Sequence, residues 1–186
     1  MKQSSHRKTS VIAASISILM LLFGCDTGTP VDDEGTGPFG SDAAVFTFVT
    51  QTDPYSAYSL FPHADSVTSG TLNGSTAHQP MVRVSMNAIA LSSLNAGRFP
   101  SSGSFRDSSV ILKEIRNSAN QTTLLAVVVK QTGHSNAGNG WLWAEFQPDG
   151  TPVYTTKNKG TGCTGCHSLE QGPQHDFIRT FERQLP

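Results

Sequence analysis

Five residues near the C-terminus have the types and the spacing of a covalent haem attachment site. Cys163-Thr164-Gly165-Cys166-His167 is a C-x-x-C-H motif, in which each of the two thiols can add to one vinyl group of a haem. The residue after the second cysteine is His167, whose imidazole is then held against the iron. The motif therefore predicts one covalent haem c, with Cys163 and Cys166 as attachment residues and His167 as the metal ligand.

A C-x-x-C pair also occurs in zinc sites, redox dithiols and structural disulfides. A zinc ribbon needs a second pair of Cys or His ligands at a similar spacing, and the sequence has none. A thioredoxin-like dithiol opens a helix inside a βαβ unit, whereas residues 157–162, which lead into this motif, are rich in Gly and Thr. Haem attachment is therefore the interpretation that we favour.

The N-terminus has the pattern of a bacterial export signal. Basic residues are followed at 11–23 by an uncharged, mostly apolar stretch that is too short for a good transmembrane span. It ends in Leu22-Phe23-Gly24-Cys25, which resembles a lipoprotein cleavage box. Phe23 departs from the small or β-branched residue usual at its position, so ordinary signal cleavage nearby and an uncleaved anchor are alternatives.

These patterns predict three segments and a compartment. Residues 1–24 are expected to be a lipoprotein-type signal peptide. Residues 25–42 are rich in Gly, Thr, Pro and Asp and predict a flexible linker after the lipidated Cys25. Residues 43–186 suffice for one haem domain. We expect a lipid-anchored protein on the periplasmic side of a bacterial membrane, the alternative being a soluble periplasmic protein. Haem is ligated to c-type cytochromes on that side, so the two motifs agree.

The charge of the chain argues against a nucleic-acid partner. Lys and Arg number 13 and Asp and Glu 14, for a formal net charge of −1. No cluster of basic residues occurs beyond the N-terminal signal, and such clusters are what phosphate backbones attract.

The segments that must position the motif read mostly as strands. Residues 82–86 alternate, with Val82, Val84 and Met86 on one face, and residues 110–115, 122–131 and 140–146 follow as further strands. Asn87 is a candidate cap for a helix over 88–95. Residues 43–50 fit a strand or a helix. We predict an α+β fold, predominantly an antiparallel β-sheet with a few short helices and a C-terminal haem site.

The placement of the motif limits the second axial ligand. No Met follows His167, so a sixth ligand has to come from upstream, where the candidates are Met81, Met86, His63, His78 and His134. Helical-bundle cytochromes also carry a C-terminal C-x-x-C-H. The rest of their chain consists of amphipathic helices, whereas this sequence has β-rich segments and loops of Gly and Ser. A five-coordinate haem held by an antiparallel sheet is the expectation.

Four stretches in order resemble the cytochrome P-460 family, whose relatives include the sheet-built, beta-type cytochrome c′. They are residues 82–87, 105–114 and 140–146, and then 163–167 followed by Asp176-Phe177. The resemblance implies a five-coordinate haem with His167 as proximal ligand and an open distal side. It also implies that Lys113 corresponds to the Lys that hydroxylamine-oxidising members join covalently to the porphyrin. The alternative is a surface Lys113 beside Glu114.

The resemblance raises a question about the distal side. Catalytic members place a carboxylate there as a general base, and the matching position is Ala126. The base is then missing unless Glu114 or Glu145 substitutes. Arg83, which is polar on an otherwise apolar strand, is a candidate to hydrogen-bond a ligand. Lys113, Arg83 and Glu114 are thus the candidate catalytic residues.

Three functions follow as hypotheses. The first is a haem oxidoreductase that oxidises hydroxylamine or a related nitrogen species and passes electrons to a redox partner cytochrome. The second is a cytochrome that binds nitric oxide without turnover, which Trp141 or Phe146 crowding the distal side would favour. The third is an electron-transfer cytochrome with a six-coordinate haem. A homodimer is a further assembly that we consider.

Overall fold

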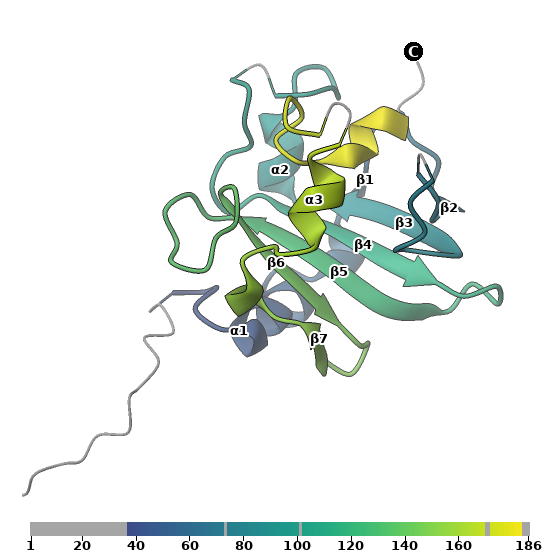
Figure 1. Ribbon diagram of the computed structural model, residues 1–186, viewed down its shortest axis with the longest axis horizontal. Coiled ribbons are helices and arrows are strands. Elements are labelled where there is room, and N and C mark those ends of the chain that lie inside the picture. The colour runs from purple at the N-terminus through teal and green to yellow at the C-terminus, as the bar shows by residue number, and fades with distance from the viewer. Residues whose placement is uncertain (1–36, 73, 101, 170–171, 184–186) are drawn as a thin grey trace, which may run out of the picture. The chain divides into compact units, whose positions relative to one another are not determined.

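A computed structural model describes residues 37–72, 74–100, 102–169 and 172–183 (Figure 1). The predicted signal peptide, Cys25 and most of the predicted linker lie outside these residues. Within them, no helix has both the length and the apolar character needed to cross a bilayer.

An antiparallel sheet of seven strands forms the centre of the described part (Figure 1). Its order is β1-β3-β4-β5-β6-β7, and β2 also pairs with β3. The strands are β1 Ser59–Leu60, β2 Thr68–Ser69, β3 Met81–Met86, β4 Val110–Arg116, β5 Thr122–Lys130, β6 Trp141–Phe146 and β7 Pro152–Tyr154. The predicted α+β class is confirmed, and the four predicted strands are β3, β4, β5 and β6.

The helices are short and lie before, between and after the strands. The α-helices are α1 Asp42–Thr47, α2 Ala88–Ser93 and α3 Cys163–His167. The other helical turns are η1 Phe48–Thr52, η2 Tyr55–Ala57, η3 Thr156–Asn158 and η4 Arg179–Arg183. The segment at 43–50 is helical because Val45 and Val49, four positions apart, are the residues that it buries.

The folded part begins earlier than the composition predicts. Phe39 is 3% exposed and its ring lies 4.7 Å from that of Phe48. The side chain of Ser41 caps α1, and the Asp42 carboxylate accepts a hydrogen bond from the backbone N–H of Thr156. The predicted linker, residues 25–42, is therefore corrected at its C-terminal end, since apolar burial and capping hold Phe39 to Asp42 on the domain.

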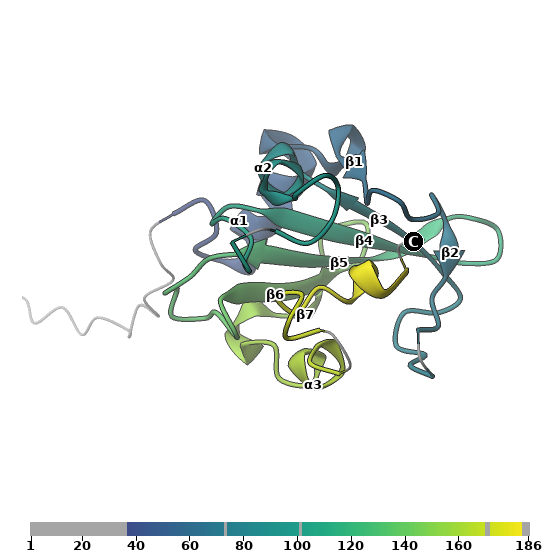
Figure 2. The ribbon, with the colours of Figure 1, turned by 90° about the horizontal axis from the view of Figure 1, so that it is seen from above.

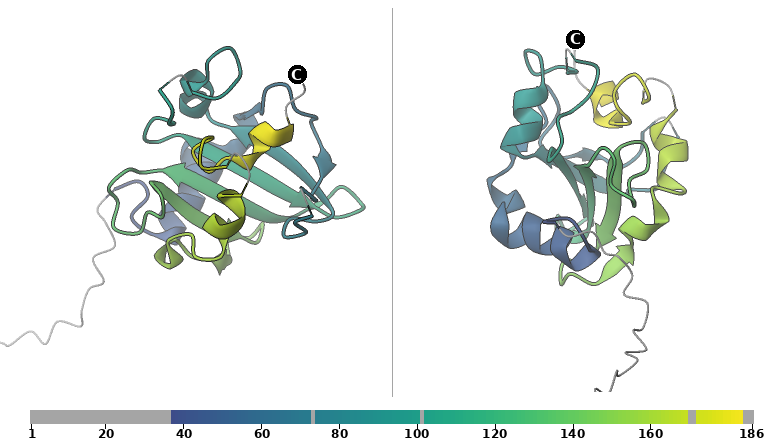
Figure 3. Two further views of the ribbon diagram at one scale, coloured as in Figure 1. Left: turned by 45° about the horizontal axis from the view of Figure 1, so that its top comes forward. Right: turned by 90° about the vertical axis from the view of Figure 1, so that its left-hand side faces the viewer.

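The two faces of the sheet are covered by different parts of the chain (Figures 2 and 3). Helix α1 and the turn after it cover one face, where they bury a cluster that includes Val45, Leu112 and Phe146. Helix α3 and the C-terminal segment cover the other face, together with a cluster that includes Val84 and Trp143. The predicted haem motif therefore lies over a single face of the sheet.

Asn87 joins helix α2 to strand β4 through buried hydrogen bonds. It is 1% exposed, and its side-chain oxygen accepts hydrogen bonds from the N–H groups of Ala90 (2.9 Å) and Val110 (3.0 Å). Its side-chain nitrogen donates to the carbonyl of Ser108 (3.0 Å). The predicted cap of α2 is confirmed, and the same side chain also fixes the start of β4.

We expect Asn87→Ala to lower the free energy of unfolding by about 2–4 kcal/mol, because it removes a helix cap and leaves buried backbone groups without partners. Urea unfolding followed by circular dichroism measures the change. The control is Asn95→Ala, at an exposed residue that hydrogen-bonds to Arg98 through its backbone. It should cost less than about 0.5 kcal/mol, and equal losses would contradict the role given to Asn87.

Candidate functional site

A cavity lies between helix α3 and the face of the sheet that α3 covers. Its volume is about 260 Å³. Strands β3 to β7 supply one wall, α3 a second, and the segment before β3 and the start of η4 complete the lining. Much of the wall is apolar, including Val82, Ile111, Val128, Trp143 and Ile178. A cavity lined mainly by apolar groups with a few polar ones is typical of a ligand or cofactor site.

One cross-strand row supplies the floor of this cavity. The register pairs Val84 with Lys113, Lys113 with Ala126, Ala126 with Glu145, and Glu145 with Tyr154. All five residues line the cavity. Because directly opposed residues share a face of the sheet, Lys113 and Glu145 stand on either side of the small Ala126. The Lys113 amine and the Glu145 carboxylate thus face the same space, each on a strand next to that of Ala126.

His78 reaches over this row from the segment that precedes β3. Its Nδ1 lies 3.1 Å from Nζ of Lys113, and its Nε2 lies 3.5 Å from Oε1 of Glu145. An ammonium group only donates, so Nδ1 accepts from Lys113 and Nε2 carries the imidazole proton toward Glu145. The side chains of His78 and Glu145 are 21% and 23% exposed. The three form a polar cluster, which we call the Lys–His–Glu cluster, and all three line the cavity.

Helix α3 brings the C-x-x-C-H residues onto the cavity. Gly162 precedes the helix with a φ of 87°, which a glycine adopts readily. Gly160 passes close to Trp143: a Cβ there would lie 2.7 Å from the indole ring. These two glycines let the chain turn tightly against β6, and Cys163, Cys166 and His167 all line the cavity.

The imidazole of His167 is oriented by a backbone carbonyl. Its Nδ1 lies 2.7 Å from the carbonyl oxygen of Phe177, so Nδ1 carries the proton and donates it. Its ring meets that of Trp143 edge to face, with centroids 4.9 Å apart. Desolvation in the cavity, with a smaller contribution from the positive charge of Lys113, lowers the pKa of His167 to about 3. The imidazole is therefore neutral near pH 7, with Nε2 available to a metal.

The surroundings of the cysteines do not resemble those of a redox dithiol or a zinc site. Burial raises the pKa of the Cys163 thiol, whereas reactive dithiols have a lowered one. The described residues contain no cluster of three or more His, Cys, Asp or Glu side chains placed to hold a metal ion alone. Two thiols beside a neutral imidazole, on the wall of an apolar cavity, fit a covalent haem. The assignment of the three residues to haem nevertheless remains a prediction.

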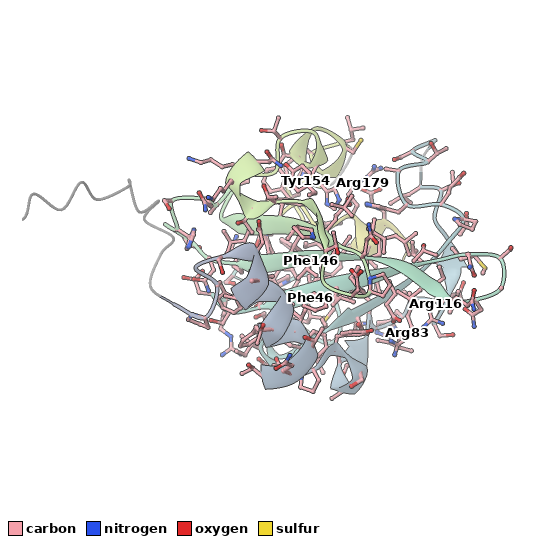
Figure 4. All side chains as sticks on the ribbon, turned by 90° about the horizontal axis from the view of Figure 1, so that it is seen from below. Phe46, Arg83, Arg116, Phe146, Tyr154 and Arg179 are labelled. Carbon is pink, nitrogen blue, oxygen red and sulfur yellow. The ribbon has the colours of Figure 1, made fainter. Side chains whose placement is uncertain are left out.

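Arg83 and Glu114 lie on the opposite face of the sheet. They oppose each other in the register, and Nη1 of Arg83 lies 2.6 Å from Oε2 of Glu114. Nη2 of Arg116 lies 2.8 Å from the other oxygen of the same carboxylate, Oε1. Figure 4 shows Arg83 and Arg116 beside each other, away from Tyr154 and Arg179. Neither Arg83 nor Glu114 lines the cavity. The prediction that Arg83 and Glu114 are catalytic residues is therefore corrected. The alternation of side chains along β3 and β4 directs both away from the cavity.

The lining of the cavity also shows which candidates for a sixth ligand and for a distal lid lie at the site. Of the five candidate ligands only His78 lines it, while Met86 is fully buried in the apolar cluster on that face. Trp141 donates its indole N–H to the carbonyl of Asp176, and Phe146 lies on the far face, its ring 5.3 Å from that of Phe46. Neither lines the cavity, so neither Trp141 nor Phe146 forms the distal lid that the second hypothesis considered.

Two of the residues that shape the site had a signal in the sequence. Trp143 and Glu145 are two positions apart in β6, so the alternation of a strand puts them on one face. The position of His78 over that face and the carbonyl of Phe177 arise from loops far from the strands in sequence, and no local pattern signals them.

Comparison with known families agrees with this geometry. The family model Cytochrome P460 matches residues 63–180, which include strands β2 to β7 and helix α3. No curated protein matches the chain significantly. The family match covers most of the chain and all of the cavity-lining residues, so the chain belongs to the cytochrome P460 family and is a haem-binding cytochrome.

Proposed function

We propose that this cytochrome binds a small nitrogen species, hydroxylamine or nitric oxide, and that it oxidises hydroxylamine. When bound, the haem would supply an iron that takes the ligand and accepts its electrons. Cys163 and Cys166 would attach it, and His167 would be its proximal ligand. The observation that carries the proposal is the Lys–His–Glu cluster, which faces the cavity that these three residues also line.

The cluster offers what hydroxylamine oxidation requires of the protein. Each electron removed from hydroxylamine leaves the nitrogen or oxygen more acidic, so a proton has to pass to a nearby base. Glu145 stands one strand from Ala126, on the same face, and His78 connects it to Lys113. The carboxylate absent at Ala126 is therefore replaced by a neighbour, with the small Ala126 side chain leaving room for the substrate.

The electrons need an acceptor outside the chain, which we propose to be a redox partner cytochrome. Hydroxylamine-dependent reduction of an oxidised c-type cytochrome, followed optically, tests the proposal. Reduction that depends on both hydroxylamine and this protein is expected. Tight nitric oxide binding without any such reduction would instead support the second candidate, a gas-binding cytochrome, which the apolar part of the wall favours.

We further propose that Lys113 is covalently joined to the porphyrin. Its strand turns the side chain into the cavity, where Nζ lies 3.1 Å from His78 and contributes to the lowered pKa of His167. A joined amine loses its cation, and a distorted porphyrin has altered iron chemistry.

The expected result for Lys113→Ala is a change from a strongly red-shifted ferrous Soret band to that of an ordinary haem c. Optical spectra of the purified proteins check this, and Lys159→Ala, at an exposed lysine, is the matched control. An ordinary Soret band in the unaltered protein would refute the cross-link and leave attachment through the cysteines unaffected.

We also propose export and lipid attachment at Cys25, with the domain on the periplasmic side of the membrane. The motif at 22–25 supports lipidation, and a haem motif behind a basic and apolar N-terminus supports export. The intact mass of detergent-extracted protein should exceed that of the haem-loaded polypeptide from Cys25 by a diacylglyceryl group. A soluble product with another N-terminus would refute the lipid alone.

A further inference from the structure

A buried ion pair lies beneath the turn that follows helix α3. Nζ of Lys130, at the end of β5, is 2.8 Å from Oδ1 of Asp176, and their side chains are 6% and 9% exposed. The same Nζ lies 5.0 Å from the centre of the Trp141 ring. A buried carboxylate is costly unless it is paired and hydrogen-bonded, so such a pair fixes the position of the chain that carries it.

The two carboxylate oxygens and the backbone carbonyl of Asp176 contact three different parts of the fold. Its Oδ2 accepts hydrogen bonds from the backbone N–H of Phe105 (2.9 Å) and from the hydroxyl of Ser104 (3.0 Å). Its carbonyl oxygen accepts one from the indole N–H of Trp141 (2.9 Å). The loop before β4 and the strands β5 and β6 therefore all hold this one residue.

The backbone at this turn adopts a conformation that needs such support. Asp176 and Phe177 have φ values of 51° and 64°, in the left-handed region that residues with a Cβ seldom adopt. Two consecutive residues of this kind persist only where their surroundings fix them. The turn directs the carbonyl of Phe177 to Nδ1 of His167, 2.7 Å away.

We propose that the Lys130–Asp176 pair is a positioning unit for the proximal histidine. By fixing the Asp176–Phe177 turn, it holds the carbonyl that accepts the Nδ1 proton of His167. That hydrogen bond sets the orientation of the imidazole and its strength as an electron donor to iron. Neither Lys130 nor Asp176 lines the cavity, so the pair acts through His167 alone. The inference rests on the proposed role of His167 as a haem ligand.

The test compares two buried carboxylates, one of which, Asp176, belongs to the turn that contacts His167, whereas the other, Glu114, lies on the opposite face of the sheet. Asp176→Asn keeps the shape of the side chain and removes the charge that pairs with Lys130. Glu114→Gln does the same to a side chain 4% exposed, which pairs with Arg83 and Arg116 on the opposite face. Both variants should lower the melting temperature and keep covalent haem.

Only Asp176→Asn should alter the iron–histidine bond. A weaker hydrogen bond from Nδ1 makes His167 a poorer donor, so the iron–histidine stretching frequency of the ferrous protein should fall and the midpoint potential should rise. Resonance Raman spectroscopy and redox titration measure the two. Should Asp176→Asn fail to fold, Ser104→Ala removes one hydrogen bond to the same carboxylate, and a smaller shift in the same directions is expected.

Two results would overturn the inference: unchanged frequency and potential in folded Asp176→Asn or Ser104→Ala, or equal shifts in Glu114→Gln. A failure of the proposed ligand itself is distinguishable, since the iron–histidine band would then be absent from the unaltered protein or would persist in His167→Gly.

Discussion

Glu145→Gln is expected to lower the rate of hydroxylamine oxidation by about 10²–10⁴-fold, the usual contribution of a positioned general base. Gln keeps the size of the side chain and its place beside Ala126 and His78, but it no longer accepts a proton. Nitric oxide binding should be nearly unchanged, because it requires no proton transfer. Stopped-flow measurement of both reactions separates loss of the base from loss of the site.

Glu114→Gln is the matched control for that experiment. Glu114 lies on strand β4, which β5 separates from the β6 strand of Glu145, and it faces away from the cavity, where it pairs with Arg83 and Arg116. Its replacement should lower stability and leave the oxidation rate near that of the unaltered protein when assayed well below the melting temperature. A Glu145→Gln protein that keeps full turnover, or a Glu114→Gln protein that loses it, would refute the assignment of the base.

His167→Gly is expected to abolish the iron–histidine band while the haem stays attached through Cys163 and Cys166. The variant removes the imidazole and leaves a space against Trp143, whose ring lies 4.9 Å from that of His167. Added imidazole should enter this space and restore the band and much of the hydroxylamine oxidation. Resonance Raman spectra with and without imidazole give the readout.

The control for the histidine is His63→Gly. His63 is exposed and does not line the cavity, so its loss should leave the spectrum unchanged. An unaltered iron–histidine band in His167→Gly would mean that another side chain ligates the iron. Among the five upstream candidates, His78 is the one that lines the cavity, and it would be the first to change next.

Alternation along the strands was sufficient to predict which side chains share the cavity face. The placement of Lys113 with Ile111 and opposite to Glu114 follows from β4 alone, and that of Trp143 and Glu145 from β6. These predictions succeed because successive residues of a strand point to opposite faces whatever the rest of the fold does.

The same rule shows why the interpretation of Arg83 failed. Val82 and Val84 face the cavity, so Arg83 between them has to face away, where Glu114 neutralises it. A polar residue on an apolar strand suggested a ligand contact, but a buried acidic partner on the neighbouring strand explains it. The pairing of Arg83 with Glu114 can be predicted only once the register between β3 and β4 is known.

The loops carry the parts of the site that no local pattern predicts. His78 reaches the Lys–His–Glu cluster because its segment folds back against Gly70, where a Cβ would lie 1.8 Å from the His78 carbonyl oxygen. The left-handed turn at Asp176 and Phe177 has no glycine to signal it. Both depend on contacts between residues distant in sequence, and so do the short strands β1, β2 and β7, which are too brief for a periodic pattern.

Peptide mapping of the purified, unaltered protein tests the central claim most directly. After proteolysis, mass spectrometry is predicted to find one haem bound to the peptide that contains Cys163 and Cys166, through two thioether bonds, with neither thiol open to alkylation. Two alkylated cysteines and a haem that acid–acetone extracts from the protein would contradict the account.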